Sequence, residues 1–89
     1  MQYKTHLAQL AERASANSHF LGYVLAQVQQ ESGISDRLLV LTLDMEPEQL
    51  PYLRLCGMPR PDRWLEDIAR IAAYVRCDAG RLAGVVGRG

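Results

Sequence analysis

Residues 33–60 read GISDRLLVLTLDMEPEQLPYLRLCGMPR, and this stretch decides the fold. Gly33 can adopt the left-handed conformation that ends many helices. Ser35 is placed to cap a following helix over residues 36–43, because its side-chain oxygen can accept a hydrogen bond from the first turn. Asp44 tolerates the positive φ that a tight turn requires. The stretch therefore predicts two short helices joined by a turn.

The second of these helices must accommodate two prolines. Pro47 suits a first helical position, whereas Pro51 would remove a backbone hydrogen bond if it lay beyond the first turn. We therefore expect a short helix over about residues 49–56, ended by Gly57. The run at residues 38–43 is apolar enough to be a strand. We favour a helix because the run is mostly leucine and no second strand exists to pair with it.

Further helices are expected on both sides of this stretch, over residues 4–15, 19–32, 63–76 and 79–86. Asn17 or Ser18 would cap the one at 19–32, although a single continuous helix through this region is also compatible with the sequence. Asp62 and Asp78 are the expected caps of the last two. The buried stripe expected on the helix over 63–76 is Leu65, Ile68, Ala69, Ala72 and Val75, widened by Trp64, Ile71 and Tyr74.

Composition describes one all-α domain. A chain of 89 residues with 48% hydrophobic residues forms a modest core, so self-association or a partner would add stability. We expect an N-terminal helical extension over 1–18, a core over 19–86 and a tail over 87–89. The chain contains no apolar run of about 18 residues and no secretory leader, which argues against a membrane partner and predicts a cytoplasmic protein.

The order of the elements resembles the Cro/repressor-type (XRE-like) helix-turn-helix family of prokaryotic regulators. The matching features are Gly33, Ile34, the Ser35 cap, the short helix 36–43, the turn Asp44-Met45-Glu46 and the second helix Pro47–Leu55. Leu39, Val40, Leu43, Met45 and Leu50 fall on the positions that the family buries, and Pro59 and Pro61 precede the next helix. The resemblance implies a five- to six-helix, lambda-repressor-like helix-turn-helix fold and a non-enzymatic, DNA-binding regulator of transcription.

DNA binding would use donors on and around the second helix of the unit. The candidate contacts are Arg37, Gln49, Tyr52, Arg54 and Arg60. Four carboxylates lie on the same edge, namely Asp36, Asp44, Glu46 and Glu48. They oppose the phosphate contacts that supply most of the affinity for DNA. The whole chain is also formally neutral, with ten basic and ten acidic residues, whereas nucleic-acid binders usually have a basic excess.

A protein-interaction adaptor or dimerisation module is the alternative function. If Leu39, Val40 and Leu43 face the core, then Leu38 and Leu41 point outward. With Tyr52 and Leu55 they would form an apolar patch with a charged rim, as interaction surfaces do. The competing interpretation is that these side chains belong to the core. A second copy of the chain and a different protein both fit as partners.

Residues with catalytic or metal-binding chemistry form no recognisable site. His6 and His19 have no nucleophile arrangement near them in the sequence, and Cys56 and Cys77 lack the spacing of a zinc site. We interpret both cysteines as reduced structural thiols and expect neither enzymatic activity nor a cofactor or metal. On the helix over 63–76, we expect surface pairs between Arg63 and Asp67 and between Glu66 and Arg70.

Overall fold

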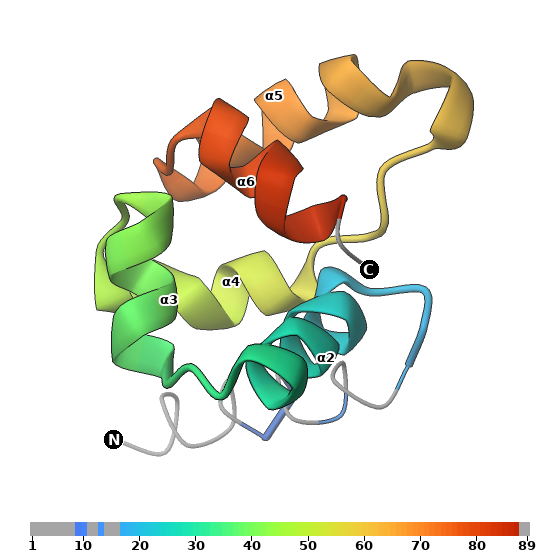
Figure 1. The fold of residues 1–89 in the computed structure, drawn as a ribbon. Helices are drawn as coiled ribbons and strands as arrows, with labels where there is room; N and C mark the ends of the chain where they lie inside the picture. Colours follow the sequence, from blue (N-terminus) through green and yellow to red (C-terminus); the bar gives the residue numbers. More distant parts are fainter. Residues whose placement is uncertain (1–8, 11–12, 14–16, 88–89) are drawn as a thin grey trace.

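The computed structural model describes residues 9–10, 13 and 17–87, which are folded as helices connected by short loops (Figure 1). The α-helices are α2 (Leu21–Ser32), α3 (Asp36–Leu43), α4 (Leu50–Leu55), α5 (Trp64–Val75) and α6 (Ala79–Val86). Single 3-10 turns, Pro47–Gln49 and Pro61–Arg63, precede α4 and α5. The expectation of an all-α protein is confirmed for these residues. Each of these helices is too short or too polar to cross a bilayer.

Helix α4 runs through the middle of the arrangement in Figure 1, with α3 and α2 at its two ends. It packs against α2 and α5, while α6 packs against α5, α2 and α3. The shared core consists of the buried apolar side chains of α2 to α6, above all Leu21, Leu25, Leu39, Leu43, Leu53, Ile68 and Leu82. The predicted inward residues Leu39, Val40, Leu43 and Leu50 are all buried.

Helix α2 begins without a side-chain cap, contrary to the expectation of Asn17 or Ser18. Its N-cap residue is Phe20, and the Asn17 side chain instead accepts a hydrogen bond from the His19 amide at 2.9 Å. The chain before α2 is held by backbone bonds to the end of α4, from Leu21 N to Cys56 O at 2.8 Å and from Met58 N to His19 O at 3.0 Å. These bonds keep residues 17–20 out of a helix, so a continuous helix into α2 is ruled out.

Helix α3 has the predicted bounds and the predicted ends. The Ser35 hydroxyl accepts a hydrogen bond from Leu38 N at 3.3 Å, and Asp44 takes the left-handed conformation with φ 56°. Gly33 ends α2 in the same conformation, with φ 66°. The lead-in to α4 explains how Pro51 is tolerated, since a separate 3-10 turn places this proline in the first turn of α4.

Two predictions about α5 are wrong. Asp62 does not cap it, because a 3-10 turn intervenes and the N-cap residue Arg63 makes no side-chain cap bond. The buried stripe is also narrower than expected: Ile68, Ala72 and Val75 are buried, but Leu65, Ala69 and Tyr74 are exposed. The physical reason is that, in the described part of the chain, α5 packs mainly against α4 and α6, which cover one narrow face of it.

The chain turns between α5 and α6 at Arg76, which takes a left-handed conformation with φ 58°. Asp78 caps α6 as predicted, accepting a hydrogen bond from Arg81 N at 2.9 Å. The predicted helix over 4–15 lies outside the described residues except for Gln9, Leu10 and Arg13, as do His6 and the end of the 87–89 tail.

Candidate functional site

Helix α4 itself presents very little side chain to solvent. Leu50 and Leu53 are buried, and every other side chain from Gln49 to Cys56 is at least partly covered. The exposed residues next to this helix are instead those of the preceding turn, Asp44, Glu46, Pro47 and Glu48. A helix that enters the major groove of DNA must project several side chains beyond the protein surface. The side chains of α4 itself are therefore mostly covered, and those that project beside it come from the turn at its start.

Arg54, a candidate DNA contact, is used inside the protein. Its Nη2 lies 2.6 Å from Asp36 Oδ1 and 3.2 Å from Gln29 Oε1, and the Gln29 amide donates to Asp36 Oδ1 at 2.8 Å. This three-residue network joins α2, α3 and α4. The Gln29 hydrogen bond, together with Arg54, holds the pKa of Asp36 below its usual range, against the opposing effect of partial burial.

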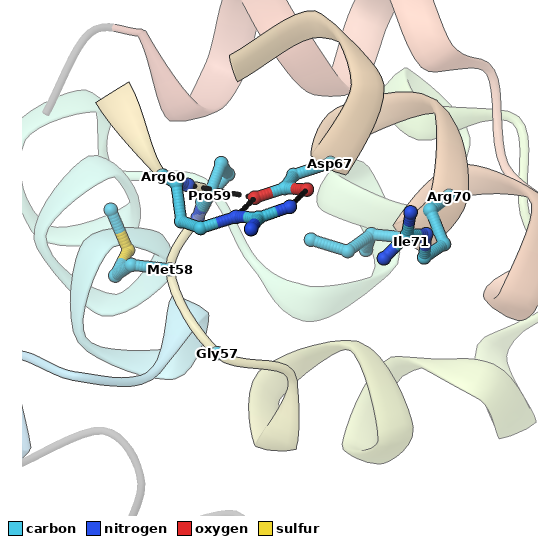
Figure 2. A pocket seen from close by; sticks show the side chains of 7 residues that line it. All are labelled: Gly57, Met58, Pro59, Arg60, Asp67, Arg70 and Ile71. Atoms are coloured by element: carbon cyan, nitrogen blue, oxygen red, sulfur yellow. Dashed lines mark hydrogen bonds and ion pairs between the residues drawn. The ribbon is translucent and has the colours of Figure 1, made fainter. Parts of the chain in front are cut away.

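Arg60, a second candidate DNA contact, is also held in an ion pair within the protein. Its guanidinium makes a two-pronged contact with Asp67 on α5, from Nε to Oδ2 and from Nη2 to Oδ1, both at 3.0 Å (Figure 2). The Arg60 backbone amide donates to the same carboxylate at 2.9 Å. Hydrogen bonds from Arg60 hold the pKa of Asp67 far below its usual range. The ion pair serves to hold the connector between α4 and α5 against α5.

The Arg60–Asp67 contact corrects the expected pairing on α5. Arg63 pairs with Glu66, at 3.0 Å, and not with Asp67. Arg70 makes no ion pair in the described part of the chain. Arg60, Asp67, Arg70 and Ile71 border an open depression of about 360 Å³, together with Gly57, Met58 and Pro59 of the connector (Figure 2). Its only carboxylate, Asp67, is held by Arg60.

Arg37 is the only one of the three candidate arginines that the described residues leave without an ion pair. It is exposed on the first turn of α3. The exposed acids Asp44, Glu46 and Glu48 likewise make no ion pair within the described ranges. Among the described residues, the cations without an ion pair around the two helices are Arg37 and Arg81, which reaches the Thr42 carbonyl from α6, and they stand against these three anions.

The outward leucines of α3 are exposed as predicted. Leu38 is 50% and Leu41 63% accessible, although both belong to the same helix as the fully buried Leu39 and Leu43. Tyr52 and Leu55, expected to complete the patch, are only partly accessible, and Tyr52 packs against the core. The apolar surface is therefore narrower than the predicted patch. We call it the Leu38–Leu41 face.

The Leu38–Leu41 face lies on a helix that is held at both ends. At the start of α3, the Ser35 cap and the Arg54 network fix the first turn. At its end, the Leu43 carbonyl accepts from Asp78 N at 2.9 Å and the Thr42 carbonyl accepts from Arg81 Nη1 at 3.2 Å. The last carbonyls of a helix lack partners of their own, so these bonds from α6 stabilise it. The exposed leucines are thus displayed on a rigid support.

Both cysteines are partly buried free thiols. Burial raises the pKa of Cys56, and burial together with the Asp78 and Cys56 charges raises that of Cys77 to about 11. A thiol reacts through its thiolate, so both side chains are poor nucleophiles at neutral pH. Among the described residues, no three His, Cys, Asp or Glu side chains gather as a metal site would require.

Comparison with protein-family models, curated proteins and solved structures yields no match for this chain. Functional inference therefore rests on the residues themselves. Sequence reasoning identified Leu38, Leu41 and Arg37 as surface residues, but it missed Gln29. The missing signal was spatial: Gln29 lies seven residues before Asp36 and 25 before Arg54, and only the turn at Gly33 brings it to both.

Proposed function

We propose that this protein is a protein-interaction module built on a helix-turn-helix type of scaffold, and that α3, rather than α4, carries its binding surface. The observation that supports this proposal is the contrast between the two helices. Two leucines of α3 are at least half accessible, whereas no side chain from Gln49 to Cys56 is exposed. Exposed apolar side chains on a rigid element, flanked by charges, are typical of protein interfaces.

The electrostatics of the same region also favour a protein partner over DNA. Neutralising phosphates requires free cations, and each one contributes through release of counterions. Arg54 and Arg60 are held by carboxylates of the protein, and releasing either would leave Asp36 or Asp67 unpaired. The unpaired charges that remain near α4 are mainly acidic. This surface would repel a DNA backbone.

Titration against bulk duplex DNA tests whether the partner is a protein and not DNA. At about 50 mM salt, where nonspecific binding is strongest, we expect no binding at micromolar protein concentrations. The positive control is the triple variant Asp44→Asn, Glu46→Gln, Glu48→Gln, in which the three acids are neutralised; it should bind at least as well as the wild type. Tight wild-type binding with a steep negative salt dependence would contradict the proposal.

Photo-crosslinking in cells tests whether α3 carries the binding surface. A photoreactive phenylalanine analogue at position 41 should form a covalent adduct with a protein partner. The matched control carries the same analogue at position 65, where Leu65 is exposed on α5 at 75% accessibility. A protein found at position 41 is then purified and titrated, and Leu41→Lys should abolish its binding while leaving the helical circular dichroism unchanged. Equal adducts at both positions would remove the support for an α3 surface.

DNA binding is the second candidate function, favoured by the family resemblance and by one observation. The Asp36 carboxylate, which would oppose a phosphate at the start of α3, is paired with Arg54, and Arg37 beside it makes no ion pair with the described residues. A phosphate could therefore approach the first turn of α3. If the DNA titration is positive, Arg37→Gln should reduce the salt slope by about one unit.

A further inference from the structure

We propose that the Leu38–Leu41 face is a contact between two copies of this chain, which pair with their α3 helices antiparallel about a two-fold axis. This inference deepens the interaction function proposed above and rests on it. Four residues would make this contact: Arg37, Leu38 and Leu41 on α3, and Asp44, the residue that ends the helix. These residues are complementary to the same residues of a second copy, so the partner is another molecule of this chain.

The two leucines are placed so that they can contact the same two leucines of an antiparallel second copy. In an antiparallel pair centred between Leu39 and Val40, Leu38 of one copy lies opposite Leu41 of the other, and the same contact occurs twice. Leu38 and Leu41 are three residues apart, so they share one face of α3. A two-fold contact requires such a self-complementary surface. Each copy would then cover the accessible leucines of the other.

The charges beside the leucines are arranged for the same pairing. Arg37 lies in the first turn of α3 and Asp44 directly follows its last residue, so the two charges mark opposite ends of the helix. In the antiparallel register Arg37 of one copy is offset from Asp44 of the other by only about 3 Å along the axis. Neither side chain has an ion-pair partner in the described part of its own chain. Two reciprocal ion pairs would form.

The helix dipole strengthens this arrangement. Within one copy, Arg37 lies near the positive N-terminus of α3 and Asp44 at its negative C-terminus, so each charge is at the unfavourable end. An antiparallel neighbour brings the opposite helix end beside each of them. Charges that are unfavourable in the monomer become favourable in the pair. A partner helix running parallel would leave them unfavourable.

The size of the surface predicts a weak dimer. Helix α3 has eight residues and is about 12 Å long, and each copy contributes only two large apolar side chains. This is smaller than the interfaces of stable complexes, so association should be visible at about 100 µM and absent at about 1 µM. Because α6 and the Arg54 network already hold α3, little ordering is needed on binding.

Sedimentation equilibrium of the purified full chain over this concentration range tests the proposal. The wild type should show a monomer–dimer equilibrium. Arg37→Glu and Asp44→Arg should each raise the dissociation constant at least about 10-fold, because each places like charges opposite one another twice. An equimolar mixture of the two variants should associate again, since both contacts are then attractive. Arg76 already shows that an arginine can adopt the left-handed conformation needed at position 44.

Two further variants keep the test decisive. Asp44→Asn tolerates the same backbone conformation and should also weaken the dimer, but its mixture with Arg37→Glu should show no recovery. Leu65→Lys on α5 is the matched control and should leave association unchanged. The proposal would be overturned by a monomeric wild type at about 500 µM, by a mixture of Arg37→Glu and Asp44→Arg that does not associate, or by an equal loss in Leu65→Lys.

Failure of the dimer and failure of the interaction function give different results. The photoreactive group at position 41 would yield an adduct of twice the chain mass if the partner is a second copy. An adduct with a different protein, together with a monomeric wild type, would overturn the dimer and leave the interaction function standing. Absence of any adduct at position 41 above the control would remove both.

Discussion

Helices α3 and α4 follow one another in the chain, carry similar shares of leucine and differ completely in how they meet solvent. Helix α3 buries one face and exposes Leu38 and Leu41, whereas α4 packs against both α2 and α5. Its only charged side chain, Arg54, is 18% accessible and held by Asp36. The layout of a two-helix unit therefore does not determine which helix is available for binding. The helices packed around the unit determine which one is exposed.

The largest expected difference between the two helices comes from removing a leucine from each. Leu53→Ala in α4 empties part of a core in which Leu53 is fully buried, so we expect a loss of about 2–5 kcal/mol in the free energy of unfolding. Leu41→Ala in α3 should change stability by less than about 0.5 kcal/mol. Urea unfolding at low micromolar concentration measures both. Equal losses would show that α3 is as enclosed as α4.

Removing an arginine from each helix should give the next largest contrast. Arg54→Gln breaks the network that joins α2, α3 and α4 and should cost about 1–2 kcal/mol, a modest value because Asp36 is largely exposed. Arg37→Gln should remain within about 0.5 kcal/mol of the wild type. Both are measured by the same unfolding curves. A neutral Arg54→Gln would mean that the network contributes nothing to the packing of α4.

The two helices also begin differently. Ser35 caps α3 through its side chain, so Ser35→Ala should destabilise the protein by about 1 kcal/mol. Gln49 precedes α4 without a side-chain cap bond, and Gln49→Ala should cost little. Thermal unfolding of the two variants compares them directly. A cost at position 49 as large as that at position 35 would contradict the difference between the two helix starts.

The smallest expected effect is the pH dependence of the contact between α3 and α4. The pKa of Asp36 is lower in the folded protein than in the unfolded chain, so its carboxylate stabilises the fold above about pH 4. This stabilisation is lost as the pH falls further, through the folded pKa. Asp36→Asn should therefore unfold more easily than the wild type at pH 6, with a gap that narrows by pH 3.

The same substitution in an Arg54→Gln protein tests whether Arg54 contributes to that pH dependence. In Arg54→Gln protein, Asp36→Asn should have a smaller effect at pH 6, because one partner of the carboxylate is already gone. Unfolding temperatures of the four proteins at pH 6 and pH 3 are the required measurements. An undiminished effect would assign the interaction to Gln29 alone.

Local signals predicted both ends of α3 and the start of α6, but they failed at the starts of α2 and α5, where no side chain caps the helix. Ser35, Asp44 and Asp78 act through hydrogen bonds and dihedral angles within a few residues of themselves, so the sequence reveals their roles. The two leucine faces of α3 also followed from helical spacing. Other wrong expectations concern relations between distant segments: Leu65 and Tyr74 have the periodicity of buried residues, but no helix of the described chain lies over them.

In the candidate site, too, contacts between distant segments could not be predicted from the sequence. Arg54 and Arg60 are chemically suited to phosphate, and nothing near them in the sequence identifies the carboxylates that hold them. Asp36 lies 18 residues from Arg54, so its pairing depends on the angle between three helices. Spacing predicts which residue types lie on the surface, but their availability depends on tertiary contacts.

The backbone bonds that join the start of α2 to the end of α4 make a closed unit of the chain between them. Leu21 N to Cys56 O and Met58 N to His19 O clamp the two ends of a stretch that contains α2, α3 and α4. The ends of such a stretch cannot separate unless both bonds break together, so it should open as one cooperative segment. In amide hydrogen exchange, the amides of Leu21 and Met58 would then exchange at a common rate.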